Sequence, residues 1–214
     1  MQISDPDRLL ALAYAGKRRE KLYVLFALDE HLGRLIATTR EPVLAQMKLA
    51  WWRENLSAGD TVISKGEPLL ASIHEQGLTA GLADLVNGWE AILGDLPLAN
   101  QALDSFASGR GGSLFAAAMA LYGQTPNAAS LSAGRIWALT DFAFRCSDRE
   151  TRDRALAMAA APTDPARLPR PLGILRGLAK SDVARGPLHR WQPGSPMRMF
   201  RAFGCALGII ASRG

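Results

Sequence analysis

Residues 24–55 read VLFALDEHLGRLIATTREPVLAQMKLAWWREN, and this stretch decides the fold. Leu and Ala are strong helix formers, and the Glu-Pro pair at 41–42 divides the stretch into two helices, because proline is favoured in the first turn of a helix. Five residues share one face of the first helix at helical spacing: Leu22, Phe26, Asp29, Gly33 and Ile36. We therefore expect Asp29 to point toward the core or into a cavity.

The rest of the chain also predicts helices, because strand-like alternation is scarce and β-branched residues are few. The expected helices cover residues 6–14, residues 17–38, and a stretch from 42 to an end between 57 and 60. Two shorter helices are expected within 68–94, one over 97–123, and one over 127–161 with a break near 147–149. The last two helices are expected over 172–185 and 197–210. Residues 162–171 are rich in proline and predict a loop. Without a repeat or a long linker, residues 1–214 predict a single all-α domain.

Composition limits the class of protein. The 214 residues are 48% hydrophobic with a net charge of +5, which is typical of a globular domain, and no apolar run approaches the ~20 residues of a membrane-spanning helix. Lys and Arg are scattered without a nucleic-acid-binding motif, so we expect no nucleic-acid partner. The N-terminus lacks the layout of a signal peptide. We expect a cytoplasmic protein, and peripheral contact with the inner membrane is left open.

Residues 44–55, LAQMKLAWWREN, with LFAL upstream, resemble the squalene/phytoene synthase family. In that family a D-D-x-x-D motif that holds magnesium stands a fixed distance before W-W-R. Counting back without gaps from 51–53, its place is taken by Gly-Arg-Leu-Ile-Ala, which includes Gly33, Arg34 and Ala37. Magnesium needs oxygen ligands, and a guanidinium offers no acceptor atom. The first metal motif is therefore degenerate.

A second stretch extends the resemblance. FASGRGGSL at 106–114 resembles the family's small-residue segment, in which glycine lets backbones approach closely. WALTDF at 137–142 resembles the L-Q-L-T-N-I that leads into the family's second motif, D-x-x-E-D. Continuing without gaps, two acids of that motif are replaced by Arg145 and Arg149, and Asp148 alone remains. Both metal motifs have thus changed in the same direction, from acidic to small or basic.

The run REP at 40–42, leading into MKLAWW at 47–52, looks most like a subgroup that keeps the helices and lacks the aspartates. That subgroup includes a mitochondrial respiratory complex I assembly factor. The resemblance implies an isoprenoid-synthase-like helical bundle without catalytic residues, metal or cofactor. It implies that the protein binds a protein partner or an isoprenoid or other lipid, and that it helps to assemble a membrane respiratory complex.

The alternative is an enzyme, a divergent prenyltransferase that condenses isoprenoid diphosphates head to head with Mg²⁺ as its cofactor. It requires Asp29, Glu30, Asp141 and Asp148 to bind the metal from shifted positions. Arginines beside so few acids would lower metal affinity, so we favour the interpretation without catalysis.

Asp29, Glu30 and Asp141 are the candidate cavity residues. A buried carboxylate is costly unless it is paired, so Asp29 is either a surviving cavity carboxylate or, as we favour, the partner of an arginine on a neighbouring helix. Asp141, Arg145 and Asp148 are expected on one helical stripe. Arg145 either pairs with these acids or binds a phosphate together with Arg34, because planar guanidinium matches phosphate geometry. In either case we expect mainly positive side chains in the interior.

Two further expectations concern aromatic and C-terminal residues. Trp51 and Trp52 lie about 100° apart on a helix, so we expect one in the core and one in a helix–helix contact. The segment 197–210 carries Arg198 and Arg201 among apolar residues, and it either lies on an anionic membrane surface or packs on the bundle. The three histidines have no metal-type spacing, His189 included.

Overall fold

The computed structural model describes residues 2–58, 66–186 and 194–206, and within these ranges the secondary structure is entirely helical, with no strand. The α-helices are α1 (Pro6–Ala13), α2 (Arg19–Thr38), α3 (Pro42–Ser57), α4 (Pro68–Glu75), α5 (Leu82–Glu90), α6 (Asn100–Phe106), α7 (Ser113–Leu121), α8 (Ala128–Arg145), α9 (Arg149–Ala159), α10 (Arg170–Val183) and α11 (Pro196–Ala206). A 3₁₀ turn, η1 (Gly16–Arg18), precedes α2, and a π-helical turn, η2 (Ala107–Gly112), joins α6 to α7. The prediction of an all-α protein is confirmed.

Most helix starts follow the local capping chemistry. The Asp5 carboxylate accepts hydrogen bonds from the backbone amides of Asp7 and Arg8, at 2.8 and 3.3 Å, and Pro6 follows at the first helical position. Proline likewise opens α3 and α4. The predicted break near 147–149 is confirmed, since α8 ends at Arg145. The start predicted at residue 97 is wrong, because α6 begins only at Asn100.

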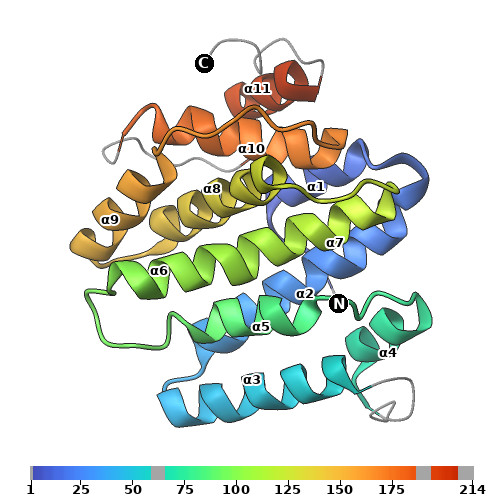
Figure 1. Cartoon of the computed structure of the whole chain (residues 1–214), viewed down its shortest axis with the longest axis vertical. Helices are drawn as coiled ribbons and strands as arrows, with labels where there is room; N and C mark the ends of the chain where they lie inside the picture. The colour runs from blue at the N-terminus through green and yellow to red at the C-terminus, as the bar shows by residue number, and fades with distance from the viewer. Residues whose placement is uncertain (1, 59–65, 187–193, 207–214) are drawn as a thin grey trace.

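The segment α6–η2–α7 runs through the middle of the molecule as one nearly continuous rod (Figure 1). Helices α5 and α2 lie on one side of this rod, and α8 lies on the other (Figure 1). Helix α10 packs on α8 and α1, α11 packs on the outer side of α10, and α3 and α4 form the opposite end of the molecule (Figure 1). The rod therefore separates the two halves of the bundle and touches both.

Glycines allow these helices to cross at very short distance. A β-carbon on Gly109 would lie 2.6 Å from the Cα of Gly88 on α5, and one on Gly111 would lie 2.2 Å from the carbonyl oxygen of Gly134 on α8. No side chain fits at either crossing. The expectation that this glycine-rich segment permits close approach is confirmed, and the backbones that approach are those of α5 and α8.

A buried ion cluster holds α11 on the bundle. Arg198 donates to Asp7 on α1 at 2.7 Å and lies 2.8 Å from a carboxylate oxygen of Asp182 on α10. The outer face of α11 exposes Met199, Phe200 and other apolar residues, so contact with a membrane surface stays a prediction. Of the expected segment 197–210, residues 207–210 lie outside the described ranges, as does His189. Within the described ranges, every helix is too short or too polar to cross a bilayer.

We predict that Gly111→Ala lowers the free energy of unfolding by about 1–3 kcal/mol or more, because the new methyl group forces α8 and η2 apart. Gly112→Ala is the matched control, since nothing lies within 4 Å of its added β-carbon and its φ of −62° is helical. We expect this control to be neutral or slightly stabilising. Urea unfolding followed by circular dichroism measures both, and equal effects would show that the crossing is not tightly packed.

Candidate functional site

A buried cluster of charged side chains surrounds Asp29 on α2. Asp29 is 0% exposed and uses both carboxylate oxygens. The Arg110 guanidinium donates to them side-on, with Nε–Oδ1 at 2.8 Å and Nη2–Oδ2 at 3.0 Å. Arg8 on α1 donates to Oδ2 at 2.6 Å, and the Trp89 indole on α5 donates to Oδ1 at 2.8 Å. The expected pairing of Asp29 with arginine on neighbouring elements is confirmed.

Arg110 is the centre of this cluster and is itself 1% exposed. Its guanidinium carbon lies 4.5 Å from the ring centroid of Trp89 and 4.6 Å from that of Trp137, so it is stacked between two indoles. Its Nη2 also donates to Asp141 on α8 at 2.6 Å. Its Nη1 faces the carbonyl oxygen of Ala138 at 3.5 Å, so this buried cation is surrounded by carboxylates, aromatic rings and one backbone carbonyl.

A second layer of pairs continues from Asp141 toward the surface. Arg145 donates to Asp141 Oδ1 at 2.9 Å, one helical turn away, and to Asp5 Oδ2 at 2.6 Å. Glu30 accepts from the Ser4 amide at 2.9 Å through Oε1, while its Oε2 lies 3.6 Å from Nη1 of Arg8. The expected pairing of Arg145 within its own helix is confirmed for Asp141.

Charge pairing fixes the protonation of this cluster. Burial by itself would raise the pKa of Asp29, but the guanidiniums of Arg110 and Arg8 outweigh it and hold the pKa below its usual value. Burial would likewise raise the pKa of Asp141, but the guanidiniums of Arg110 and Arg145 outweigh this effect and lower the pKa. Burial would lower the pKa of Arg110, and the facing carboxylates of Asp29 and Asp141 raise it instead. All three side chains are charged at neutral pH.

The cluster forms one wall of a cavity of about 470 Å³. Seven of the residues singled out from the sequence line this cavity: Asp29, Glu30, Gly33, Arg34, Ala37, Asp141 and Arg145. The remaining wall is largely apolar and includes Ile36, Ile92 and Phe142. The structure thus brings the residues at 33–37 and the inward acids of α2 and α8 to one place.

Two sequence-derived candidates lie elsewhere. Because α8 ends at Arg145, Asp148 is not on the expected stripe. It is the N-cap of α9, where it accepts from the Thr151 amide at 2.7 Å. The side chain of Arg149 is 85% exposed and lies 3.6 Å from Asp153. The expected helical stripe from Asp141 to Asp148 is therefore wrong.

The expectation of a mainly positive interior is also wrong. The cavity is lined by four carboxylates, those of Asp5, Asp29, Glu30 and Asp141. It is lined equally by four guanidiniums, those of Arg8, Arg34, Arg110 and Arg145. The formal charges of the lining therefore sum to zero, and three of the four guanidiniums, those of Arg8, Arg110 and Arg145, are paired with its carboxylates.

The packing around Gly33 explains why position 33 cannot carry an acid in this structure. A β-carbon on Gly33 would lie 2.9 Å from the Trp89 ring, so any side chain at this position would displace that indole. The indole in turn donates to Asp29, one helical turn earlier. A glycine at 33 is therefore required by the Asp29 cluster itself.

Arg110 and Trp89 complete the cluster, and neither was predicted from the sequence. A signal for Arg110 was present, since one arginine between glycines in an otherwise apolar helical run must be buried and therefore needs an acidic partner. No signal identified Trp89, which meets Asp29 across 60 residues of chain.

No protein-family model, curated protein or solved structure matches this chain.

We predict that Asp29→Asn lowers the free energy of unfolding by about 3–5 kcal/mol, because it leaves two buried guanidiniums facing a neutral side chain. The matched control is Glu90→Gln, which breaks the partly exposed pair with Arg53. We expect less than about 1 kcal/mol there. Chemical denaturation measures both variants, and a loss at Asp29 no larger than the control's would contradict the central role of this cluster.

The lowered pKa of Asp29 also predicts a pH dependence. A carboxyl whose pKa is lower in the folded state stabilises the fold fully above its unfolded-state pKa of about 3.9 and loses that contribution as the pH falls toward the folded value. Below about pH 4, the wild type should therefore lose stability more steeply than Asp29→Asn, by up to ~1.4 kcal/mol per pH unit. Parallel unfolding profiles of the two proteins in acid would refute this assignment.

Proposed function

We propose that this protein does not catalyse a reaction and that it binds an amphipathic, anionic lipid such as an isoprenoid phosphate in the cavity beside Asp29. The observation that carries the proposal is that arginines engage the carboxylates of the cavity wall. By the resemblance drawn from the sequence, we further propose an isoprenoid-synthase-like bundle and a role in the assembly of a membrane respiratory complex.

Magnesium does not fit the donor atoms of this cavity. Both oxygens of Asp29 and both oxygens of Asp141 are held by guanidinium groups at 2.6–3.0 Å. A divalent ion would have to displace these cations, and the guanidiniums of Arg8 and Arg110 would then be buried without their carboxylate partner. Among the described residues, no group of three or more His, Cys, Asp or Glu side chains is placed to hold a metal ion.

An anionic lipid fits the same cavity better. Its volume of about 470 Å³ lies in the range of small-molecule sites, and Ile36, Ile92 and Phe142 offer an apolar wall for a hydrocarbon chain. Arg34 lies at the edge, is exposed, and its guanidinium has no carboxylate partner in the ranges 2–58, 66–186 and 194–206. It can therefore meet a phosphate without breaking an existing ion pair.

The proposal predicts binding of farnesyl diphosphate that persists in EDTA, with no release of diphosphate when Mg²⁺ and a reducing cofactor are added. Arg34→Ala should weaken this binding about tenfold, because one charge-assisted hydrogen-bonding group is lost. Arg149→Ala is the matched control, since it removes an exposed arginine that lies outside the cavity. Isothermal titration measures affinity, and a colorimetric phosphate assay with pyrophosphatase measures turnover.

Two results would overturn the proposal. Magnesium-dependent diphosphate release that is lost in folded Asp29→Asn would establish the prenyltransferase alternative. Failure of the wild type to bind farnesyl diphosphate, or equal weakening by Arg34→Ala and Arg149→Ala, would remove the cavity as the lipid site.

A further inference from the structure

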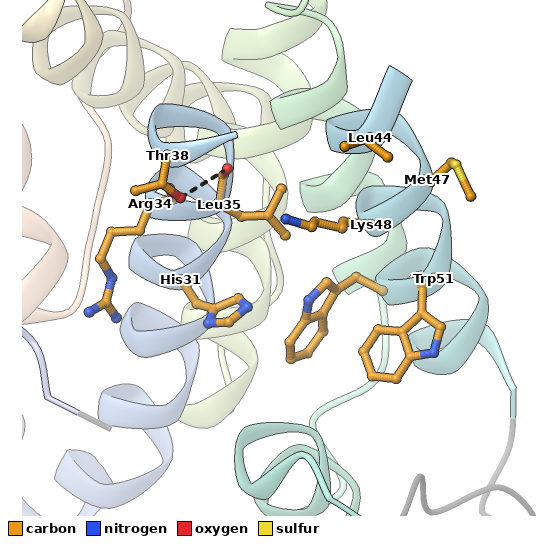
Figure 2. A pocket seen from close by; sticks show the side chains of 9 residues that line it. His31, Arg34, Leu35, Thr38, Leu44, Met47, Lys48 and Trp51 are labelled. Atoms are coloured by element: carbon orange, nitrogen blue, oxygen red, sulfur yellow. Dashed lines mark hydrogen bonds between the residues drawn. The ribbon is translucent and has the colours of Figure 1, made fainter. Parts of the chain in front are cut away.

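A second concave site lies on the other side of α2. The groove has a volume of about 570 Å³ and runs between α2 and α3 (Figure 2). The rings of His31 and Trp52 pack against each other inside it, with centroids 4.9 Å apart. Lys48 extends from α3 toward Leu35 on α2 (Figure 2). This groove does not include Asp29 or the ion cluster around it.

The α3 side of the groove presents apolar residues to solvent. Leu44, Met47 and Trp51 are 45%, 64% and 38% exposed, and they follow one another at i, i+3 and i+7. Both paired tryptophans line the groove: Trp52 is buried in the core as expected, whereas Trp51 is exposed. The three exposed residues form one stripe about 10 Å long, which corresponds to two helical turns. Exposed apolar surface of this kind, with Trp and Met at its centre, is typical of a protein-binding site.

The charges of the groove are of one sign. Its lining contains Arg34 and Lys48 and no carboxylate. Burial lowers the pKa of His31, so the imidazole is neutral at neutral pH. Lys48 donates to the Thr39 hydroxyl at 3.3 Å, which leaves further donors of its ammonium group for an acidic ligand. The groove therefore combines an apolar stripe with cations at its edge.

We infer that this groove is the docking site for an amphipathic helix of a partner protein, with acidic residues flanking the apolar face of that helix. A helix laid along the groove would place its own apolar residues, also spaced i, i+3 and i+7, against Leu44, Met47 and Trp51. Its flanking carboxylates would then lie near Lys48 and Arg34, where opposite charge selects the partner. The inference does not rest on the proposed lipid site, although Arg34 lines both the groove and the Asp29 cavity.

The test uses the full-length protein and a designed, fluorescently labelled helical peptide of about 16 residues, with leucines on one face and glutamates beside them. A second peptide carries lysine in place of every glutamate. Fluorescence anisotropy should show binding of the acidic peptide alone, weakened by added salt. Met47→Glu, Trp51→Ala and Lys48→Glu should each raise the Kd at least about tenfold. Leu9→Glu, on the exposed surface of α1, is the matched control and should leave the Kd unchanged.

Any of three results would overturn the inference. Neither peptide binding, or both binding equally, would show that the groove does not select an acidic helix. A dimer in sedimentation experiments that Met47→Glu dissociates would show that a second copy of this chain covers the stripe. Binding to vesicles of phosphatidylglycerol that the same substitution abolishes would assign the groove to a membrane surface.

Discussion

The ion pair between Arg110 and Asp29 is the interaction on which the arrangement of the central helices depends. Neither side chain is more than 1% exposed, so each buried charge requires a partner of opposite sign, and the two supply this to each other through two hydrogen bonds. Arg110 reaches Asp29 because η2 passes α5 and α8 at backbone contact, with Gly109 against Gly88 and Gly111 against Gly134. The glycine crossings thus place Arg110 within hydrogen-bonding distance of Asp29.

The same pair constrains what the cavity can do. A carboxylate whose two oxygens already accept hydrogen bonds from guanidiniums has little capacity left to bind a hard cation. A metal ion that took the oxygens of Asp29 would leave the buried guanidiniums of Arg8 and Arg110 without charge compensation. The ion cluster joins α1, α2, α5, η2 and α8, so its loss would affect most of the bundle. The carboxylates of Asp29 and Asp141 can serve either the ion pairs that stabilise the fold or a metal ion, and in this structure they serve the ion pairs.

Local signals in the sequence were sufficient for most of the fold and for part of the site. Proline and capping residues locate the starts of α1, α3 and α4, and helical periodicity turns Asp29 inward. The failures are of two kinds. Asp148 was misplaced because helical spacing was applied to three residues past Arg145, although the backbone leaves the helix at Cys146 and Asp148 already caps α9. Arg110 and Trp89 were missed because their partner Asp29 is 81 and 60 residues away, and spacing along one helix carries no information on such contacts.

Helix α2 is the structural link between the two proposed binding sites. One face carries Asp29 and Gly33 into the cavity, another carries His31 and Leu35 into the groove, and Arg34 borders both. A phosphate that draws the Arg34 guanidinium toward the cavity would leave Lys48 as the cation of the groove lining, so an acidic helix would dock more weakly. By thermodynamic reciprocity, a docked helix that holds Arg34 would weaken binding of the phosphate to the same degree. If both sites are used, a single arginine therefore couples them with negative sign, without movement of the buried cluster.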